Sequence, residues 1–261
     1  MANLFQWLRW VHIAAGSIAL LLFWIPAIAR KGSRTHIRAG WFYVACMSVV
    51  VVTAFAMSGL AFTIPLSVRR IARPLSPAEL SDFLRAQRIS ATFLAYLAGV
   101  TLVAGWQGIW AVETKREPKA MRTAFGLALN VAVLLGGLTV FVLGFKYGSG
   151  PLIALSPIGP FVAAGNLRYL LRGPQSRMHW WYEHLSSMIA TAIAGYTAFL
   201  VFGAARLLPS VARSQLNTIF WVLPSLIGVP VIYITVAYYQ RKFRETGRAS
   251  GVSSPHVQLD S

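Results

Sequence analysis

The chain has few carboxylates, and none of them lies in the middle of an apolar run. Asp and Glu account for seven of its 261 residues. They are Glu79, Asp82, Glu113, Glu117, Glu183, Glu245 and Asp260. Proton-coupled pumps and transporters commonly place carboxylates or histidines within the bilayer, and here only histidines are available near it. The sequence also has no GxSxG motif and no glycine-rich phosphate loop, so it gives no sign of a serine hydrolase or a nucleotide-binding domain.

Cysteine is rarer still. The chain has one, Cys46, which lies within an apolar run. A single cysteine excludes an intramolecular disulfide and a CxxC motif. Because apolar surroundings make a thiol inert, we expect Cys46 to be a buried structural residue.

Apolar residues are abundant and are grouped into long runs. They make up 56% of the chain, while charged residues make up 12%; soluble domains have about 45–50% and 25%. Runs of about 20 apolar residues are long enough to span a bilayer, so the sequence predicts an all-α integral membrane protein. The first run, residues 10–29, could be mistaken for a signal peptide, but its length and the following Arg30-Lys31 favour a retained helix.

The net charge of +17 has a membrane explanation. Most of the 24 Lys and Arg residues lie between the apolar runs, where membrane proteins keep the charges that set their orientation. We therefore expect the lipid bilayer as the partner and no nucleic acid. The expected location is the cell (inner) membrane, with several crossings.

The number of crossings depends on one ambiguous run. Helices are expected over residues 10–29, 39–66, 77–112, 123–145, 180–207 and 219–239. Ser76 and Glu79 form a capping-box pattern that predicts a helix start at Pro77. Residues 148–167 contain three prolines and form either a kinked fifth crossing or a re-entrant segment.

The basic residues favour seven crossings. With seven, 15 Lys and Arg lie on one side and 9 on the other, whereas six crossings give 14 and 10. Since short cytoplasmic loops are rich in Lys and Arg, we expect seven helices with the N-terminus outside and the C-terminus cytoplasmic. Residues 1–240 would form one transmembrane domain, and residues 241–261 a polar, disordered cytoplasmic tail.

Four histidines lie near predicted membrane boundaries: His12, His36, His179 and His184. His179 and His184 are five residues apart, so on one helix they would point about 140° away from one another. They cannot chelate one metal from a single helix, and we expect His179 in the loop before it. Seven crossings place His36 and His184 on the same side and His12 on the other; six crossings place His12 with His184 instead.

These positions suggest a ligand site held by His36 and His184 from two helices. Imidazoles suit b-type haem iron, zinc or copper. The possible accessory residues are His12, His179, Glu183, Asn166 and Arg168. Glu183 could orient a histidine, but it points about 100° away from its neighbour His184 and is expected to serve another partner. The alternative is that the histidines simply bond backbone carbonyls and lipid headgroups.

Three functions follow from these alternatives. The first is a haem- or metal-binding membrane protein, which could transfer electrons within the membrane. The second is a cofactor-free permease or scaffold whose histidines are structural or respond to protons. The third is a zinc-dependent membrane hydrolase, which is weakened by the lack of clustered acids.

Two stretches resemble a bacterial membrane-protein family that is known as a domain of unknown function. The first carries His12, Gly16, Lys31-Gly32, His36, Gly40 and Tyr43, and the second carries His184, Met188, Ala192 and Thr197-Ala198-Phe199. Members of the family usually have an aspartate where this chain has Asn166, which puts in doubt any role that needs a carboxylate there. The resemblance implies seven crossings and supplies no activity.

Overall fold

The computed structural model describes residues 1–69, 71, 73–115, 117–204 and 216–244, and within them it has helices and connecting loops but no strand. In this part of the chain seven helical segments are long and apolar enough to cross a membrane. They are α1 with α2 (Ala2–Leu22, Trp24–Ile28), α3 (Arg34–Thr63), α5 (Pro77–Glu113), α6 (Ala124–Tyr147), α7 with α8 (Gly150–Leu155, Ile158–Arg172), α9 with the π-helix η2 (His179–Ala198, Phe199–Ala204) and α12 (Leu216–Lys242). The predicted all-α fold with seven candidate spans is confirmed.

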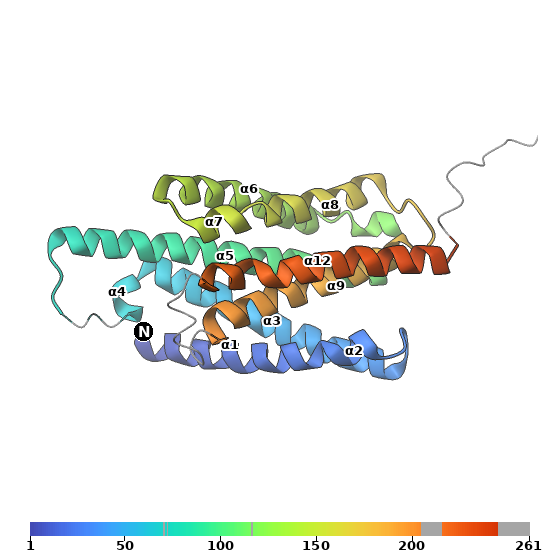
Figure 1. Cartoon of the computed structure of the whole chain (residues 1–261), viewed down its shortest axis with the longest axis horizontal. Helices are drawn as coiled ribbons and strands as arrows, with labels where there is room; N and C mark the ends of the chain where they lie inside the picture. Colours follow the sequence, from blue (N-terminus) through green and yellow to red (C-terminus); the bar gives the residue numbers. More distant parts are fainter. Residues whose placement is uncertain (70, 72, 116, 205–215, 245–261) are drawn as a thin grey trace, which may run out of the picture.

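The helices form a bundle of three tiers around α5. Figure 1 shows α6, α7 and α8 in one tier, α5, α9 and α12 in the next, and α1, α2 and α3 in the third. Helix α5 packs against α3, α6 and α9. Its 37 residues make it about 55 Å long, more than the roughly 30 Å apolar core of a bilayer. The N-terminal part of α5 therefore projects beyond the rest of the bundle (Figure 1).

Short polar side chains fix where several helices begin. Ser76 and Glu79 form the predicted capping box, in which Glu79 N donates to Ser76 Oγ over 3.3 Å and Ser76 N donates to Glu79 Oε2 over 2.9 Å. The expected start of the second span at residue 39 is wrong, because Ser33 caps α3 and accepts from the backbone N of His36 over 3.2 Å. This earlier start places His36 in the first turn of α3.

The proline-containing run is the kinked fifth span, broken into α7 and α8. Pro160 has no N–H to donate to the Ser156 carbonyl, as a regular helix would require. Instead the buried hydroxyl of Tyr96 on α5 donates to this carbonyl over 2.7 Å, and it accepts from the backbone N of Gly159 over 2.7 Å. A side chain from another helix thus supplies the hydrogen bonds that the backbone lacks at the break.

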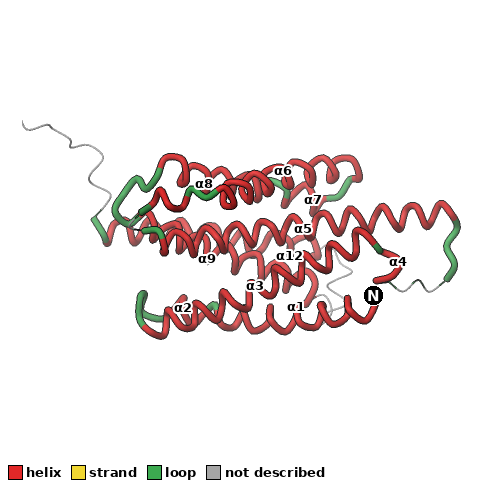
Figure 2. The backbone as a smooth tube through the Cα atoms, turned by 180° about the vertical axis from the view of Figure 1, so that it is seen from behind, coloured by secondary structure: helices red, strands yellow, loops and turns green. Residues whose placement is uncertain are grey.

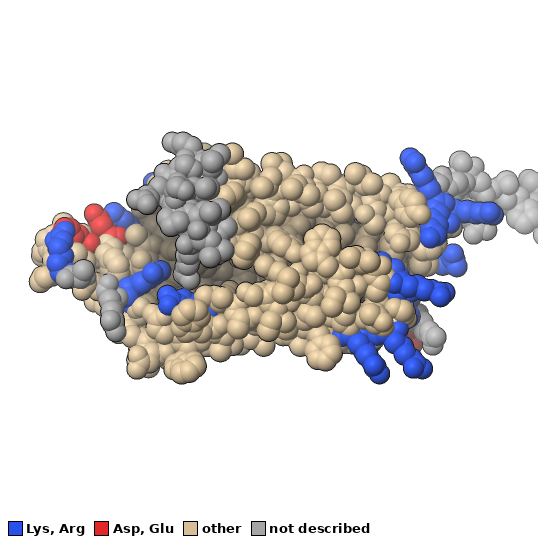
Figure 3. Space-filling model, turned by 60° about the horizontal axis from the view of Figure 1, so that its bottom comes forward, with Lys and Arg blue, Asp and Glu red and all other residues tan. Residues whose placement is uncertain are grey.

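Loops gather at the two ends of the bundle, and the basic residues gather there with them. Figure 2 shows the loops beyond the helix ends, and Figure 3 shows Lys and Arg at both ends and none across the middle of the face in view. We call one of these ends the basic end. It comprises the loops at 29–33, 114–123 and 173–178 together with the C-terminal end of α12 at Lys242. Which end faces the cytoplasm stays a prediction.

Some expectations fall partly on residues that the structure does not describe. The expected end of the sixth span at residue 207 and the tail from 245 onward, including His256, lie outside the described residues. Helix α12 continues to Lys242, past the expected end at 239, and it contains Pro224 and Pro230. The first span begins at Ala2 instead of residue 10.

Candidate functional site

The predicted pair, His36 and His184, comes together at the basic end of the bundle. The two rings lie with their centroids 6.4 Å apart and their planes at 68°. His36 is held in the first turn of α3, and His184 lies about one turn into α9. Helix α5 packs against both of these helices. The structure therefore contains a histidine pair assembled from helices that are far apart in the sequence.

Both histidines use the same ring nitrogen to bond a backbone carbonyl. Nδ1 of His36 bonds the Pro26 carbonyl oxygen over 3.0 Å, and Nδ1 of His184 bonds the Gly108 carbonyl oxygen over 2.9 Å. A carbonyl oxygen only accepts, so each Nδ1 carries a proton and donates it, and Nε2 is the ring nitrogen that is left to bind a ligand. This arrangement, with one nitrogen fixed by a carbonyl, is typical of metal-ligating histidines.

A hydrogen bond joins α3 and α9 two turns deeper than the histidine pair. The hydroxyl groups of Tyr43 and Thr191 are buried and are hydrogen-bonded over 2.7 Å. Each residue follows its histidine by seven positions, so the two pairs lie at matching levels along the two helices. This bond fixes the register in which His36 faces His184.

Gly108 brings α9 close to α5 and positions the His184 ring. A Cβ atom added at Gly108 would lie 2.3 Å from Cε of Met188 and 3.0 Å from Cβ of Ser187. A larger residue would push α9 away from the carbonyl to which His184 donates. The sequence reasoning missed Gly108, although a glycine in an otherwise bulky WQGIW stretch marks a close approach between helices.

The neighbouring Glu183 serves a different partner, as predicted. Its Oε2 accepts from Nε2 of Gln107 over 2.9 Å, and its Oε1 lies 3.5 Å from Nε2 of His179. Two consecutive residues of α9 thus bond two consecutive residues of α5, with the carboxylate on one side and the imidazole on the other. Gln107 is 1% exposed and was also missed, although it is a rare polar side chain within an apolar span.

His179 is placed differently from the prediction. It is the first residue of α9, because the helix begins one residue earlier than expected, and it does not lie in the loop. Its Nδ1 accepts from the backbone N of Gln175 over 2.9 Å, so this nitrogen carries no proton. Its Nε2 faces Glu183, and its ring packs edge-on against Tyr169 with centroids 4.9 Å apart. With both nitrogens engaged, His179 has no lone pair left for a ligand of the histidine pair.

Lys31 lies beside the pair, although its position in the sequence suggested no role in a ligand site. Its Nζ donates to the carbonyl oxygens of Pro26 over 2.8 Å and of Ala27 over 2.6 Å. Lys31 therefore caps the end of α2 and shares the Pro26 oxygen with His36. Its partial burial lowers the pKa of its ammonium group below the usual lysine value.

His12 lies far from the pair. Its Nδ1 bonds the carbonyl oxygen of Val50 over 3.1 Å and Oγ1 of Thr53 over 2.9 Å. Val50 is 14 residues beyond His36 on α3, which corresponds to about 21 Å along the helix. The geometry agrees with the prediction that seven spans separate His12 from His36 and His184.

Asn166 and Arg168 belong to a different part of the bundle. Both lie on α8, which packs mainly against α6 and α5. Asn166 is buried and Arg168 is exposed. The structure therefore does not bring these two residues to the histidine pair.

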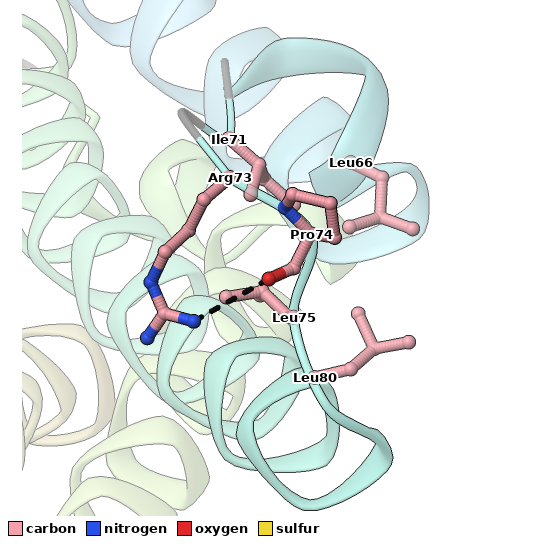
Figure 4. A pocket seen from close by; sticks show the side chains of 6 residues that line it. All are labelled: Leu66, Ile71, Arg73, Pro74, Leu75 and Leu80. Carbon is pink, nitrogen blue, oxygen red and sulfur yellow. Dashed lines mark hydrogen bonds between the residues drawn. The ribbon is translucent and has the colours of Figure 1, made fainter.

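One cavity lies at the other end of the bundle, away from the histidine pair. It has a volume of about 400 Å³, and Figure 4 shows the side chains that line it. They are Leu66, Ile71, Arg73, Pro74, Leu75 and Leu80. The Arg73 guanidinium is already engaged, since it pairs with Glu79 over 2.5 Å and donates to the Pro74 carbonyl over 3.4 Å. No predicted site residue lines this cavity.

A smaller cavity, of about 160 Å³, lies between α3, α5 and α6. Its lining is almost wholly apolar and includes Phe55, Leu102, Leu129 and Val133, with Tyr96 the one residue that carries a hydroxyl. That hydroxyl is engaged at the break between α7 and α8. The cavity offers no group for catalysis or metal ligation.

The donor inventory narrows what the histidine pair can hold. Among the described residues, no group of three or more His, Cys, Asp or Glu side chains is placed to hold a metal ion. The pair therefore supplies two imidazole nitrogens and no third ligand of these types.

Comparisons with family models, with curated proteins and with solved structures found no match to this chain, so its resemblance to the family of unknown function stays a prediction.

Proposed function

We propose that this chain is a multi-pass membrane protein that binds b-type haem between His36 and His184. The observation that carries the proposal is the 6.4 Å spacing of two imidazoles, each fixed through Nδ1 by a backbone carbonyl. The proposed role is electron transfer at the membrane, since a bound haem would supply one-electron redox chemistry. His36 and His184 would be the axial ligands, while the Pro26 and Gly108 carbonyls hold the two rings in the ligating tautomer.

The ring spacing fits two ligands on opposite sides of one metal. A metal–imidazole bond is about 2.0 Å long, and a ring centroid lies about 1.1 Å behind its nitrogen, so two opposed rings have centroids about 6.3 Å apart. Two imidazoles at a tetrahedral angle would have centroids only about 5 Å apart. The spacing of 6.4 Å agrees with the opposed arrangement, which is that of axial haem ligands.

The number of donors also favours haem over a bare divalent metal. Structural zinc sites use four protein ligands and catalytic zinc sites three, whereas the described residues offer two at this site. The porphyrin ring of a haem supplies four nitrogen ligands to the iron, so the protein needs to supply only one or two more. The zinc-hydrolase alternative has no third ligand to support it here.

Titration of the purified protein with hemin in detergent tests the proposal. We expect one hemin per chain and a Soret band shifted by ligation. His36→Ala and His184→Ala should each weaken binding at least about tenfold, because each removes one axial ligand. The matched control is His12→Ala, which removes an imidazole of α1 that bonds Val50 and Thr53 midway along α3, and it should leave the titration unchanged.

The outcomes separate the proposed function from its alternatives. Well-folded protein that shows no Soret shift with hemin would refute haem binding and would favour a cofactor-free permease or scaffold. Stoichiometric zinc or copper in its place, lost in His184→Ala, would instead support the metal-binding alternative. Equal binding by the wild type and both pair variants would show that the hemin lies elsewhere.

A further inference from the structure

Among the described residues no carboxylate pairs with the ammonium group of Lys31, and one of its N–H groups has no acceptor. A lysine ammonium has three donors, and two of them serve the carbonyls of Pro26 and Ala27. The ion pairs in the described part of the chain join Arg73 to Glu79, Arg85 to Asp82 and His179 to Glu183, and none involves Lys31. A partly buried cation without a carboxylate is costly unless an anion approaches it.

This cation lies against the histidine pair. Its bond and the bond from His36 meet at one oxygen, that of Pro26, over 2.8 and 3.0 Å, so the ammonium lies within about 6 Å of the His36 ring nitrogen. Lys31 also interacts electrostatically with the His184 ring. The positive charge of Lys31, which no carboxylate among the described residues neutralises, therefore lies close to both imidazoles of the proposed site.

We propose that Lys31 recognises a carboxylate of the ligand that His36 and His184 hold. This inference rests on the proposed function and narrows the ligand to a haem whose propionate groups are free and ionised. A carboxylate next to Lys31 would use the third N–H and neutralise the charge. A bare divalent cation would instead be repelled by it.

Two hemin probes isolate this contact. Hemin carries two free carboxylates, and hemin dimethyl ester has the same iron and ring but neutral ester groups. The dissociation constants of both are measured for each protein by Soret titration in one detergent at low salt. Because the ester partitions differently into micelles, the quantity compared between proteins is the ratio of the two constants.

Lys31→Gln removes the charge and keeps a donor for the carbonyls at the end of α2. We expect the preference for hemin over the ester to fall by at least about fivefold in this variant, while the ester itself binds as it does to the wild type. That unchanged ester binding also shows that the variant is folded. The matched control is Arg30→Met, which removes an exposed charge from the adjacent position and should keep the wild-type ratio.

Each result decides the inference. A ratio that is the same in Lys31→Gln and the wild type, or that falls equally in Arg30→Met, overturns the role of Lys31 and leaves haem binding intact. If the wild type binds neither probe, the proposed function fails and this inference fails with it. If Lys31→Gln binds neither probe while the wild type binds both, Lys31 holds the histidine pair through Pro26 and does not read a carboxylate.

Discussion

Removal of the Tyr96 hydroxyl should destabilise the bundle at the break in its fifth span. Tyr96→Phe leaves the Ser156 carbonyl and the Gly159 N–H, both bonded over 2.7 Å in the wild type, without partners in the interior. Leaving a buried polar group unpaired costs about 1–3 kcal/mol, but hydrogen bonds inside membrane proteins average only about 0.6 kcal/mol with a maximum near 1.7. For two bonds we expect a loss of about 1–3 kcal/mol in the free energy of unfolding.

Reversible unfolding in mixed detergent micelles, followed by tryptophan fluorescence, measures this loss. The control is Tyr147→Phe, which deletes the same atom from an exposed ring outside the break and should change stability by less than about 0.5 kcal/mol. If Tyr96→Phe proves as stable as this control, another group satisfies the Ser156 carbonyl. The account of how the chain tolerates the break would then be wrong.

Three further changes probe the packing, the pair's surroundings and the pH response. Gly137→Ala adds a Cβ 2.4 Å from a proline ring of α8 and should lower the unfolding free energy by about 1–3 kcal/mol, while Gly165→Ala, with nothing within 4 Å, should not, in the same micelle assay. Gln107→Leu removes the donor of the Glu183 carboxylate and should destabilise the chain more than the double variant Gln107→Leu/Glu183→Leu does. A double-mutant cycle measures this difference, and additive losses of stability would contradict the contact. Burial lowers the pKa of Lys31 in the folded chain, so the unfolded chain binds this proton more tightly. The melting temperature of the wild type should therefore rise with pH up to about 10.4, and that of Lys31→Gln should rise less over the same range. If the melting temperature depends on pH in the same way in the two proteins, this linkage is excluded.

The bundle itself was predictable because lipid imposes strong constraints on sequence. Apolar length predicted the spans, and the Ser76–Glu79 box predicted the start of α5. Helix starts were predicted less well where polar or basic residues continue the helix beyond the membrane. Ser33 caps α3 within such a basic stretch, and the resulting start five residues early could not be found from hydropathy.

The histidine pair was predictable only in part. Boundary position and span count suggested that His36 and His184 share a side, and the structure places their rings 6.4 Å apart. Their partners are backbone carbonyls, those of Pro26 and Gly108, and a sequence pattern does not reveal backbone acceptors. The position of Lys31 escaped prediction for the same reason, since it depends on the path of α2 and not on residue type.

The electron paramagnetic resonance spectrum of the hemin-loaded ferric protein tests the central claim most directly. Simultaneous ligation by His36 and His184 predicts a six-coordinate, low-spin ferric signal, which gives way to a high-spin signal when either histidine is replaced by alanine. A high-spin signal in the wild type would mean that at most one imidazole reaches the iron. That result would contradict the proposal that the two rings, 6.4 Å apart, form one site.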